Sequence, residues 1–271
     1  MTSRPTGLPS FGSPPIDEVA IAVQFADLEG VSSSQIRDFW RVVRNDYPFI
    51  ENQPTLDVPL ESPESDELAV VEIRLASLPF RNERLWLISE ADDYLIQVQS
   101  TRFIQNWRRR GNEYPHFEEV RDLFWRNFET FRDFLKRNGL PDPKIEQVEV
   151  TYINWVSELS VSEFLKPAGQ AAIHFAGSTH NADLQTWTAR YTIANNLGIP
   201  QRLHVQALPA VRASNKSLRG TQLSLVVRAA NRDGLTDANV SSLVNESRAV
   251  IVEAFTELTT DIAHLRWERL S

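Results

Sequence analysis

The run DEVAIAVQF, residues 17–25, places an apolar side chain at every second position. This alternation predicts a β-strand with one buried face. A second run of the same kind, VEVTY at residues 148–152, opens the other half of the chain. In both halves a serine and a short apolar segment come next, at residues 32–43 and 160–165. Strand-like runs and a long amphipathic helix follow in both, so the order of elements predicts one module that occurs twice.

Each half of the chain ends on a segment whose apolar residues recur at helical spacing. The first segment carries Phe117, Val120, Phe124, Phe128, Phe131 and Leu135, and the second carries Val240, Val244, Ser247, Ile251, Ala254 and Leu258. The spacing predicts two long helices, each with one face buried against a sheet. We expect Phe124, Phe128 and Phe131 to lie in the core.

The strand-like runs between these landmarks complete the predicted fold. They are residues 68–75, 84–89, 94–99 and 101–107 in the first half, and residues 171–175, 184–194, 202–208 and 218–228 in the second. An antiparallel sheet that is hydrophobic on one face needs a cover, which one long helix can provide. We therefore predict an α+β protein of two pseudo-repeated modules, each an antiparallel sheet packed on a long helix. The element order resembles the half-unit of the TATA-box-binding protein and the helix-grip folds.

Proline-rich segments indicate the domain boundaries. We expect a flexible amino terminus at residues 1–15, a first module at residues 16–140 and a second at residues 141–271. Within the first module, prolines alternate with acidic residues over residues 47–67. Because repeated proline disfavours helices and central strands, this part is predicted to be an extended, exposed, acidic arm.

The composition of the 271 residues limits the classes of protein. Hydrophobic residues make up 42% and charged residues 24%, which is typical of a globular protein with a sizeable core. Cysteine is absent, which excludes disulfides, thiolate nucleophiles and sulfur-ligated metals. The amino terminus lacks the apolar stretch of a signal peptide, and no later run is long enough to span a membrane. We expect a cytoplasmic, bacterial-type protein.

Several motifs occur in a fixed order along the first half. They include PIDEV at residues 15–19, RFIQNWR at residues 102–108 and TYIN at residues 151–154. Together they resemble a sporadically distributed family of bacterial proteins of unknown function, often found near mobile or defence-type gene clusters. The resemblance covers residues 14–156 well and implies no established activity, cofactor or catalytic residue.

The strongest candidate binding surface is the segment Arg102–Arg110. Its candidate residues are Arg102, Phe103, Asn106, Trp107, Arg108, Arg109 and Arg110. Aromatic rings can stack on bases, and guanidinium groups can neutralise phosphates. The alternative is that Phe103 and Trp107 alternate into the core, while the arginines face solvent or pair with the acidic arm. The net charge of −8 disfavours binding to a phosphate backbone without sequence preference.

Signals for catalysis are weak. His174 and His180 lie near Asp183, and His204 lies on a later predicted strand. A metal site of two of these histidines and the Asp183 carboxylate is therefore geometrically conceivable. None of them has the spacing of a known metal motif. The sequence contains no nucleophile elbow, phosphate-binding glycine loop or dinucleotide fingerprint. We therefore predict no catalytic residues, no metal site and no cofactor.

These observations favour a non-catalytic binding or adaptor protein that acts with protein partners, in a bacterial defence or mobile-element system. Its partner is expected to be another protein or a second copy of the chain, because seven tryptophans and fourteen phenylalanines exceed the needs of any visible active site. The alternative is a nucleic-acid-binding component that uses Arg102–Arg110. A metal-dependent hydrolase is the third hypothesis.

Overall fold

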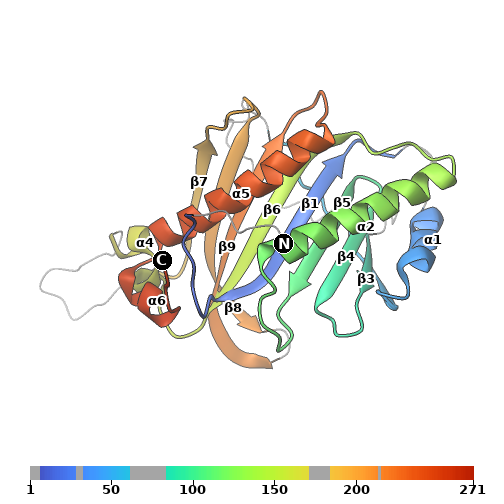
Figure 1. The fold of residues 1–271 in the computed structure, drawn as a ribbon. Helices are drawn as coiled ribbons and strands as arrows, with labels where there is room; N and C mark the ends of the chain where they lie inside the picture. Colours follow the sequence, from blue (N-terminus) through green and yellow to red (C-terminus); the bar gives the residue numbers. More distant parts are fainter. Residues whose placement is uncertain (1–6, 29–32, 62–83, 171–183, 213–214) are drawn as a thin grey trace, which may run out of the picture.

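The chain folds around one antiparallel β-sheet. The computed structural model describes residues 7–28, 33–61, 84–170, 184–212 and 215–271. Its strands are β1 (Ile16–Phe25), β2 (Phe49–Gln53), β3 (Arg84–Ile88), β4 (Tyr94–Gln99), β5 (Arg102–Arg108), β6 (Ile145–Val156), β7 (Trp187–Ile193), β8 (Gln201–Arg212) and β9 (Asn215–Ala230). Within the described residues the sheet has nine strands in the order β2-β3-β4-β5-β1-β6-β9-β8-β7. Figure 1 shows the sheet with the long helices in front of it.

Strands β1 and β6 join the two halves of the chain at the centre of this sheet. Their register runs from Ile16 opposite Asn154 to Phe25 opposite Ile145. The predicted class, two α+β modules with separate sheets in the manner of TATA-box-binding-protein or helix-grip half-units, is therefore wrong. Two separate sheets would leave one edge of each opening strand with unpaired N–H and C=O groups. Pairing β1 with β6 satisfies both edges and makes the sheet continuous.

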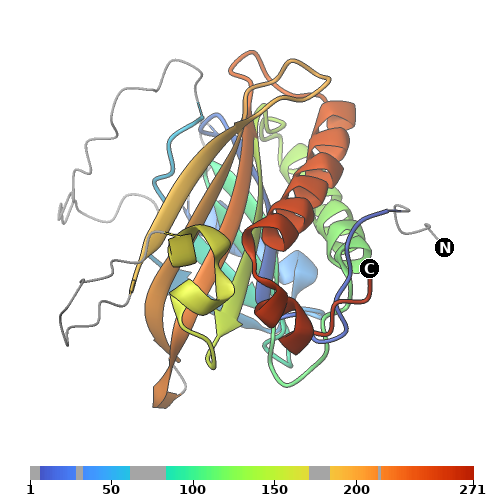
Figure 2. The ribbon, with the colours of Figure 1, turned by 90° about the vertical axis from the view of Figure 1, so that its left-hand side faces the viewer.

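The two long helices lie on the same face of the sheet (Figures 1 and 2). Helix α2 (Phe117–Arg137) packs on β1 and β5, and α5 (Asp237–Leu258) packs on β6 and β9. The shorter helices are α1 (Ser33–Val43), α3 (Val161–Phe164), α4 (Lys166–Gln170) and α6 (Asp261–Arg266). Among the described helices, none combines the length and the apolar character that crossing a membrane requires.

A cluster of phenylalanine rings forms the core under α2. Phe124, Phe128 and Phe131 are fully buried, which confirms the prediction for these three residues. The ring of Phe103 on β5 lies 5.4 Å from that of Phe128 and 5.5 Å from that of Phe131. The helical spacing on α2 and the alternation on β5 therefore bring phenylalanine rings of both elements together between the helix and the sheet.

The strand predictions succeed where alternation is strong. The expected runs at residues 84–89 and 94–99 correspond to β3 and β4, which end within one residue of them. Strand β2 lies inside the predicted exposed arm and is not expected from the sequence. It is an edge strand on which Phe49 is exposed, so it lacks the apolar alternation that signals burial. The expected strands at residues 68–75 and 171–175 lie outside the described residues.

Candidate functional site

The face of the sheet opposite α2 and α5 carries polar side chains on its central strands. We call it the polar face and define it by Glu18, Gln24, Gln97, Gln99, Arg102, Asn106, Arg108, Gln147, Glu149, Arg202, His204 and Arg228. Successive residues of a strand point to opposite faces, so these side chains alternate with the apolar residues of the core. The sheet therefore separates a largely apolar helical side from a side that can bind through hydrogen bonds and charges.

The predicted segment Arg102–Arg110 is divided between these two faces. Phe103 and Trp107 are fully buried in the core on the helical side, as the alternative interpretation expected. Their rings are therefore unavailable for stacking on bases. Arg102 and Asn106 lie on the polar face, and each is only 2% exposed.

The other three arginines of the segment hold neighbouring parts of the chain. Arg108 pairs with Asp92 in the turn between β3 and β4, and Arg110 Nε donates to the same carboxylate over 2.6 Å. Arg109 Nε donates to the carbonyl oxygen of Ile16 over 2.8 Å. Both partners, Asp92 and Ile16, lie outside the acidic arm of residues 47–67. Within this group only Arg110 is classed as exposed.

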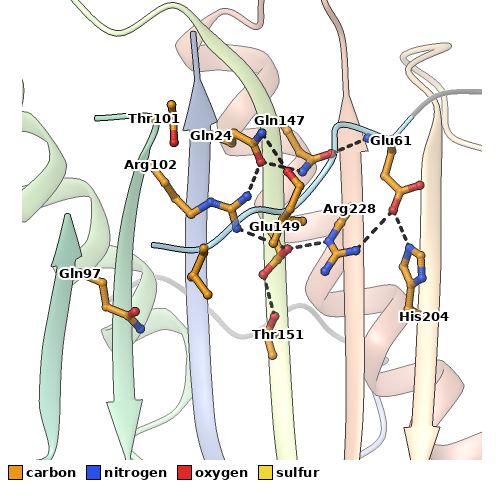
Figure 3. Close-up of polar contacts among 12 residues, drawn as sticks. Gln24, Glu61, Gln97, Thr101, Arg102, Gln147, Glu149, Thr151, His204 and Arg228 are labelled. Atoms are coloured by element: carbon orange, nitrogen blue, oxygen red, sulfur yellow. Dashed lines mark hydrogen bonds and ion pairs between the residues drawn. The ribbon is translucent and has the colours of Figure 1, made fainter. Parts of the chain in front are cut away.

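Residues 54–61, which we call the crossing segment, run across several strands on the polar face (Figure 3). Three glutamines from three strands bind its backbone. Gln99 Oε1 accepts from the Leu56 N–H over 3.0 Å, and Gln99 Nε2 donates to the Leu56 carbonyl over 3.0 Å. Gln24 Nε2 donates to the Val58 carbonyl over 3.1 Å. Gln147 Oε1 accepts from the Glu61 N–H over 2.8 Å, so the sheet binds this segment mainly through its main chain.

One side chain of the crossing segment makes an apolar contact with the sheet. Leu56 packs against Ala20 and Ala22 of β1 and Ile104 of β5. The two alanines have short side chains, so a chain lying on the sheet can approach β1 closely. This small apolar cluster is separate from the main core.

Glu61 ends the crossing segment in a cluster of basic groups. Its carboxylate lies 2.6 Å from His204 Nε2, 3.4 Å from Arg202 Nη1 and 3.6 Å from Arg228 Nη1. The Glu61 side chain is 8% exposed. Burial alone would raise the pKa of Glu61, but the hydrogen bond with His204 and the charges of His204, Arg228 and Arg202 outweigh it and lower the pKa. Glu61 is therefore ionised at neutral pH.

The cluster around Glu61 continues along the sheet through Glu149. Arg228 Nε donates to Glu149 Oε2 over 2.6 Å, and Arg102 Nη1 lies 4.0 Å from the same oxygen. Arg102 also donates to Gln24 Oε1. Burial lowers the pKa of Arg102, while the Glu149 charge raises it. Arg102 is thus a buried cation whose nearest carboxylate is at the outer limit of an ion pair (Figure 3).

A second polar network occupies the β3–β4–β5 part of the face. Gln97 Oε1 accepts from Arg84 Nη1 over 2.8 Å and from Trp86 Nε1 over 3.0 Å. Gln97 Nε2 donates to Asn106 Oδ1 over 2.8 Å, and Asn106 Nδ2 donates to Glu18 Oε1 over 2.6 Å. Burial raises the pKa of Glu18, and the bond from Asn106 opposes this effect. The network therefore connects four strands through neutral amides.

Three arginines of this region retain unused donor capacity. In the part of the chain that the structure describes, the buried Nε atoms of Arg84, Arg102 and Arg108 have no hydrogen-bond partner. Buried polar atoms are nearly always bonded, so each of these atoms is a potential donor to an acceptor from outside. Carbonyl and carboxylate oxygens are the acceptors that a guanidinium group prefers.

Of the residues behind the third hypothesis, a metal-dependent hydrolase, only His204 lies in the described part of the chain. His204 is engaged by Glu61, and His174, His180 and Asp183 lie outside the described residues. Among the residues with assigned positions, no group of three or more His, Asp or Glu side chains could hold a metal ion. His264 bonds Thr259 instead, with 2.8 Å between Nε2 and Oγ1.

Comparison with known proteins leaves the function to be argued from this geometry. A scan against models of protein families finds no match, and a search of curated proteins also finds none. The resemblance of the PIDEV, RFIQNWR and TYIN motifs to a bacterial family of unknown function therefore stays a prediction.

Proposed function

We propose that the protein is a non-catalytic binding protein that acts with a protein partner. In this proposal the polar face takes an extended, acidic segment of the partner in place of the crossing segment. The observation that carries the proposal is the way in which Gln24, Gln99 and Gln147 bond the main chain of residues 54–61 while the basic cluster takes the carboxylate of Glu61.

This division of contacts suits the recognition of a peptide. Bonds to the main chain can be made with any extended sequence, whereas the basic cluster at the end selects a carboxylate. A neutral hydrogen bond contributes about 0.5–1.5 kcal/mol, and one to a charged group about 1.5–3 kcal/mol. The carboxylate is therefore the strongest single determinant of which segment binds.

The chain's own segment sets the affinity that a partner needs. A tethered segment competes at an effective concentration on the order of millimolar for a short linker. A partner must therefore bind more tightly than residues 54–61 do, and the unpaired Nε atoms of Arg84, Arg102 and Arg108 offer it further bonds. This competition would make the protein a selective binder rather than a general peptide trap.

Nucleic acid is the second candidate for this surface. The buried Nε atom of Arg102 favours it, because phosphate oxygens are also good acceptors. Against it, Arg108 and Arg110 are paired with Asp92, Arg228 is paired with Glu149, and the whole chain is acidic. The setting in a defence or mobile-element system rests on the motif resemblance alone and belongs to the same proposal.

A labelled peptide tests the proposal directly. The full-length Glu61→Ala variant has a weakened crossing segment and should bind a fluorescent peptide with the sequence of residues 53–61 in trans. Arg228→Met in the same background should weaken binding about tenfold or more, because it removes a charged partner. The matched control is Arg137→Met, which removes an exposed arginine of α2 on the other side of the sheet.

The outcomes separate the two candidates. Binding of the peptide that is lost with Arg228→Met and kept with Arg137→Met supports the peptide surface. No binding at millimolar peptide contradicts it. If single-stranded RNA or DNA binds instead, with an affinity that falls steeply with salt, the nucleic-acid candidate takes its place.

A further inference from the structure

A cavity of about 570 Å³ lies on the helical side of the sheet, away from the polar face. Its walls come from α5, from β6 and from the residues just before α2, and residues 9–14 form another wall. That wall is fastened to the carboxyl terminus, because the Gly12 N–H donates to the Glu268 carbonyl over 2.8 Å and the Leu270 N–H donates to the Ser10 carbonyl over 2.8 Å. The volume lies within the range of small-molecule sites.

Arg248 of α5 brings a buried positive charge to this cavity. The residue is 8% exposed, and its guanidinium lies over the ring of Phe117 at 5.4 Å from the centroid. Its carboxylate partner is Glu118, with 3.5 Å between Arg248 Nη1 and Glu118 Oε1. Arg248 Nε is buried and has no hydrogen-bond partner among the described residues. Arg248 also shares a side-chain hydrogen bond with Tyr152. A guanidinium group has five N–H donors, so Arg248 can serve a further acceptor beside these two partners.

Two tyrosine hydroxyl groups also line the cavity. Tyr114 Oη and Tyr152 Oη lie 3.1 Å apart, so one hydroxyl donates to the other and the second proton is free to bond a ligand. Burial raises the pKa of Tyr152 to about 12, although the hydrogen bond with Tyr114 and then the charge and hydrogen bond of Arg248 oppose the rise. Burial also raises the pKa of Tyr114 well above its usual value. Both hydroxyls are therefore protonated donors at neutral pH.

The rest of the cavity is largely apolar, with Phe11, Leu225, Ile251 and Phe255 among its lining residues. The rings of Phe11 and Phe255 meet edge to face, with centroids 5.4 Å apart. An apolar enclosure with a few convergent polar groups is the usual design of a site for a small organic molecule.

The backbone at the cavity rim is strained. His116, which lines the cavity, has φ 67° and ψ 154° immediately before α2. A non-glycine residue in this region costs about 1–3 kcal/mol, and such residues cluster at ligand sites.

We propose that this cavity binds a small monocarboxylate with an apolar body. The ligand carboxylate accepts from the guanidinium group of Arg248, which lines the cavity, and from the free hydroxyl proton of the Tyr114–Tyr152 pair. The body of the ligand lies against the apolar wall. Glu118 beside Arg248 disfavours a dianion such as a phosphate monoester, because the second negative charge would face the carboxylate. The inference is independent of the peptide surface, which lies on the opposite face of the sheet.

Calorimetric titration of the full-length protein tests this site with matched probes. Octanoate and 3-phenylpropionate carry the carboxylate, whereas 1-octanol and octylamine have a similar apolar body without it. We expect the carboxylates to bind at least tenfold more tightly than octanol and octylamine. The Arg248→Met variant should lose this preference.

A second variant keeps the test decisive if Arg248→Met does not fold. Tyr114→Phe with Tyr152→Phe removes both hydroxyls and keeps both rings, so octanoate affinity should fall about tenfold for the bond that is lost. The matched control is Tyr94→Phe, whose hydroxyl bonds Glu119 outside this cavity. Equal affinity for octanoate and octanol, or no binding of either carboxylate at millimolar concentration, would overturn the proposal.

Discussion

The contribution of Glu61 to holding the crossing segment on the sheet can be measured by hydrogen exchange of one backbone amide, that of Leu56. In the native chain the Leu56 N–H is bonded to Gln99, so its hydrogen exchange reports whether residues 54–61 are seated on the sheet. Glu61→Gln keeps the shape of the side chain and removes its charge. It thereby converts a charge-assisted bond with His204 into a neutral one and removes the attraction of Arg202 and Arg228.

The expected magnitude follows from these contacts. The charged bond contributes about 1.5–3 kcal/mol, and a neutral bond in the same place returns about 0.5–1.5 kcal/mol. The opening free energy of the segment should therefore fall by about 1–2 kcal/mol, which raises the exchange rate of the Leu56 amide roughly five- to thirtyfold. The matched control is Glu51→Gln, an exposed carboxylate on β2.

Two results would refute this reasoning. If the Leu56 amide exchanges at the same rate in Glu61→Gln as in Glu51→Gln, the glutamine contacts alone hold the segment. If the amide of Val227, a fully buried residue of β9, accelerates by the same factor, the substitution has weakened the whole fold instead. Local release requires that the Leu56 amide responds and the Val227 amide does not.

Four further outcomes are expected. Phe128→Ala should lower the free energy of unfolding by about 3–5 kcal/mol in urea denaturation, because the ring is fully buried, and an unchanged midpoint would contradict this. His116→Gly should raise the free energy of unfolding by roughly 1 kcal/mol, because glycine adopts this backbone conformation without strain. A variant less stable than the native protein would show that His116 is not strained. Folding lowers the pKa of Glu61, so the stabilisation from its charge is present above the usual value of 4.5 and is lost as the pH falls through the lowered value. The protection factor of the Leu56 amide should therefore decline in that acidic range, and the Glu61→Gln variant should show no such decline. Purified wild-type protein should show no appreciable binding to DNA or RNA at low salt; tight binding that Arg108–Arg110 to glutamate abolishes would favour the nucleic-acid function.

Local patterns predict the elements of this fold but not the way in which the strands join. The alternation in DEVAIAVQF depends on one strand, and the spacing of Phe124, Phe128 and Phe131 depends on one helix, so both can be read from the sequence. The pairing of β1 with β6 joins residues more than 100 positions apart. An apolar strand with two pairable edges does not specify which partner takes the second edge.

The candidate site is less predictable than the fold for a related reason. Clustered charge draws attention to Arg102–Arg110, although two of its aromatic residues belong to the core. The glutamines of the polar face have no motif, and Gln147 meets a backbone amide 86 positions earlier in the chain. They occupy the polar positions of alternating strands, where a solvent-facing residue is expected, so the local pattern does not distinguish them. Glu61 looks like one acidic residue of an exposed arm until the sheet brings His204 to it.

The chemistry of the polar face fits the proposed exchange of the crossing segment better than a permanent attachment. If residues 54–61 were only a fixed cover, apolar side chains would hold them at lower cost, because burying a charge such as that of Arg102 carries a large desolvation penalty. The small cluster around Leu56 shows that the sheet can make such a contact. The charged and amide side chains of the polar face need hydrogen-bond partners from any segment that lies on them. A displacing segment must therefore offer carbonyl groups to the glutamines and a carboxylate to the basic cluster. The buried charges make the attachment of residues 54–61 less stable than an apolar contact would be. In the proposed exchange the same charges would restrict the displacing segment to one that is extended and acidic.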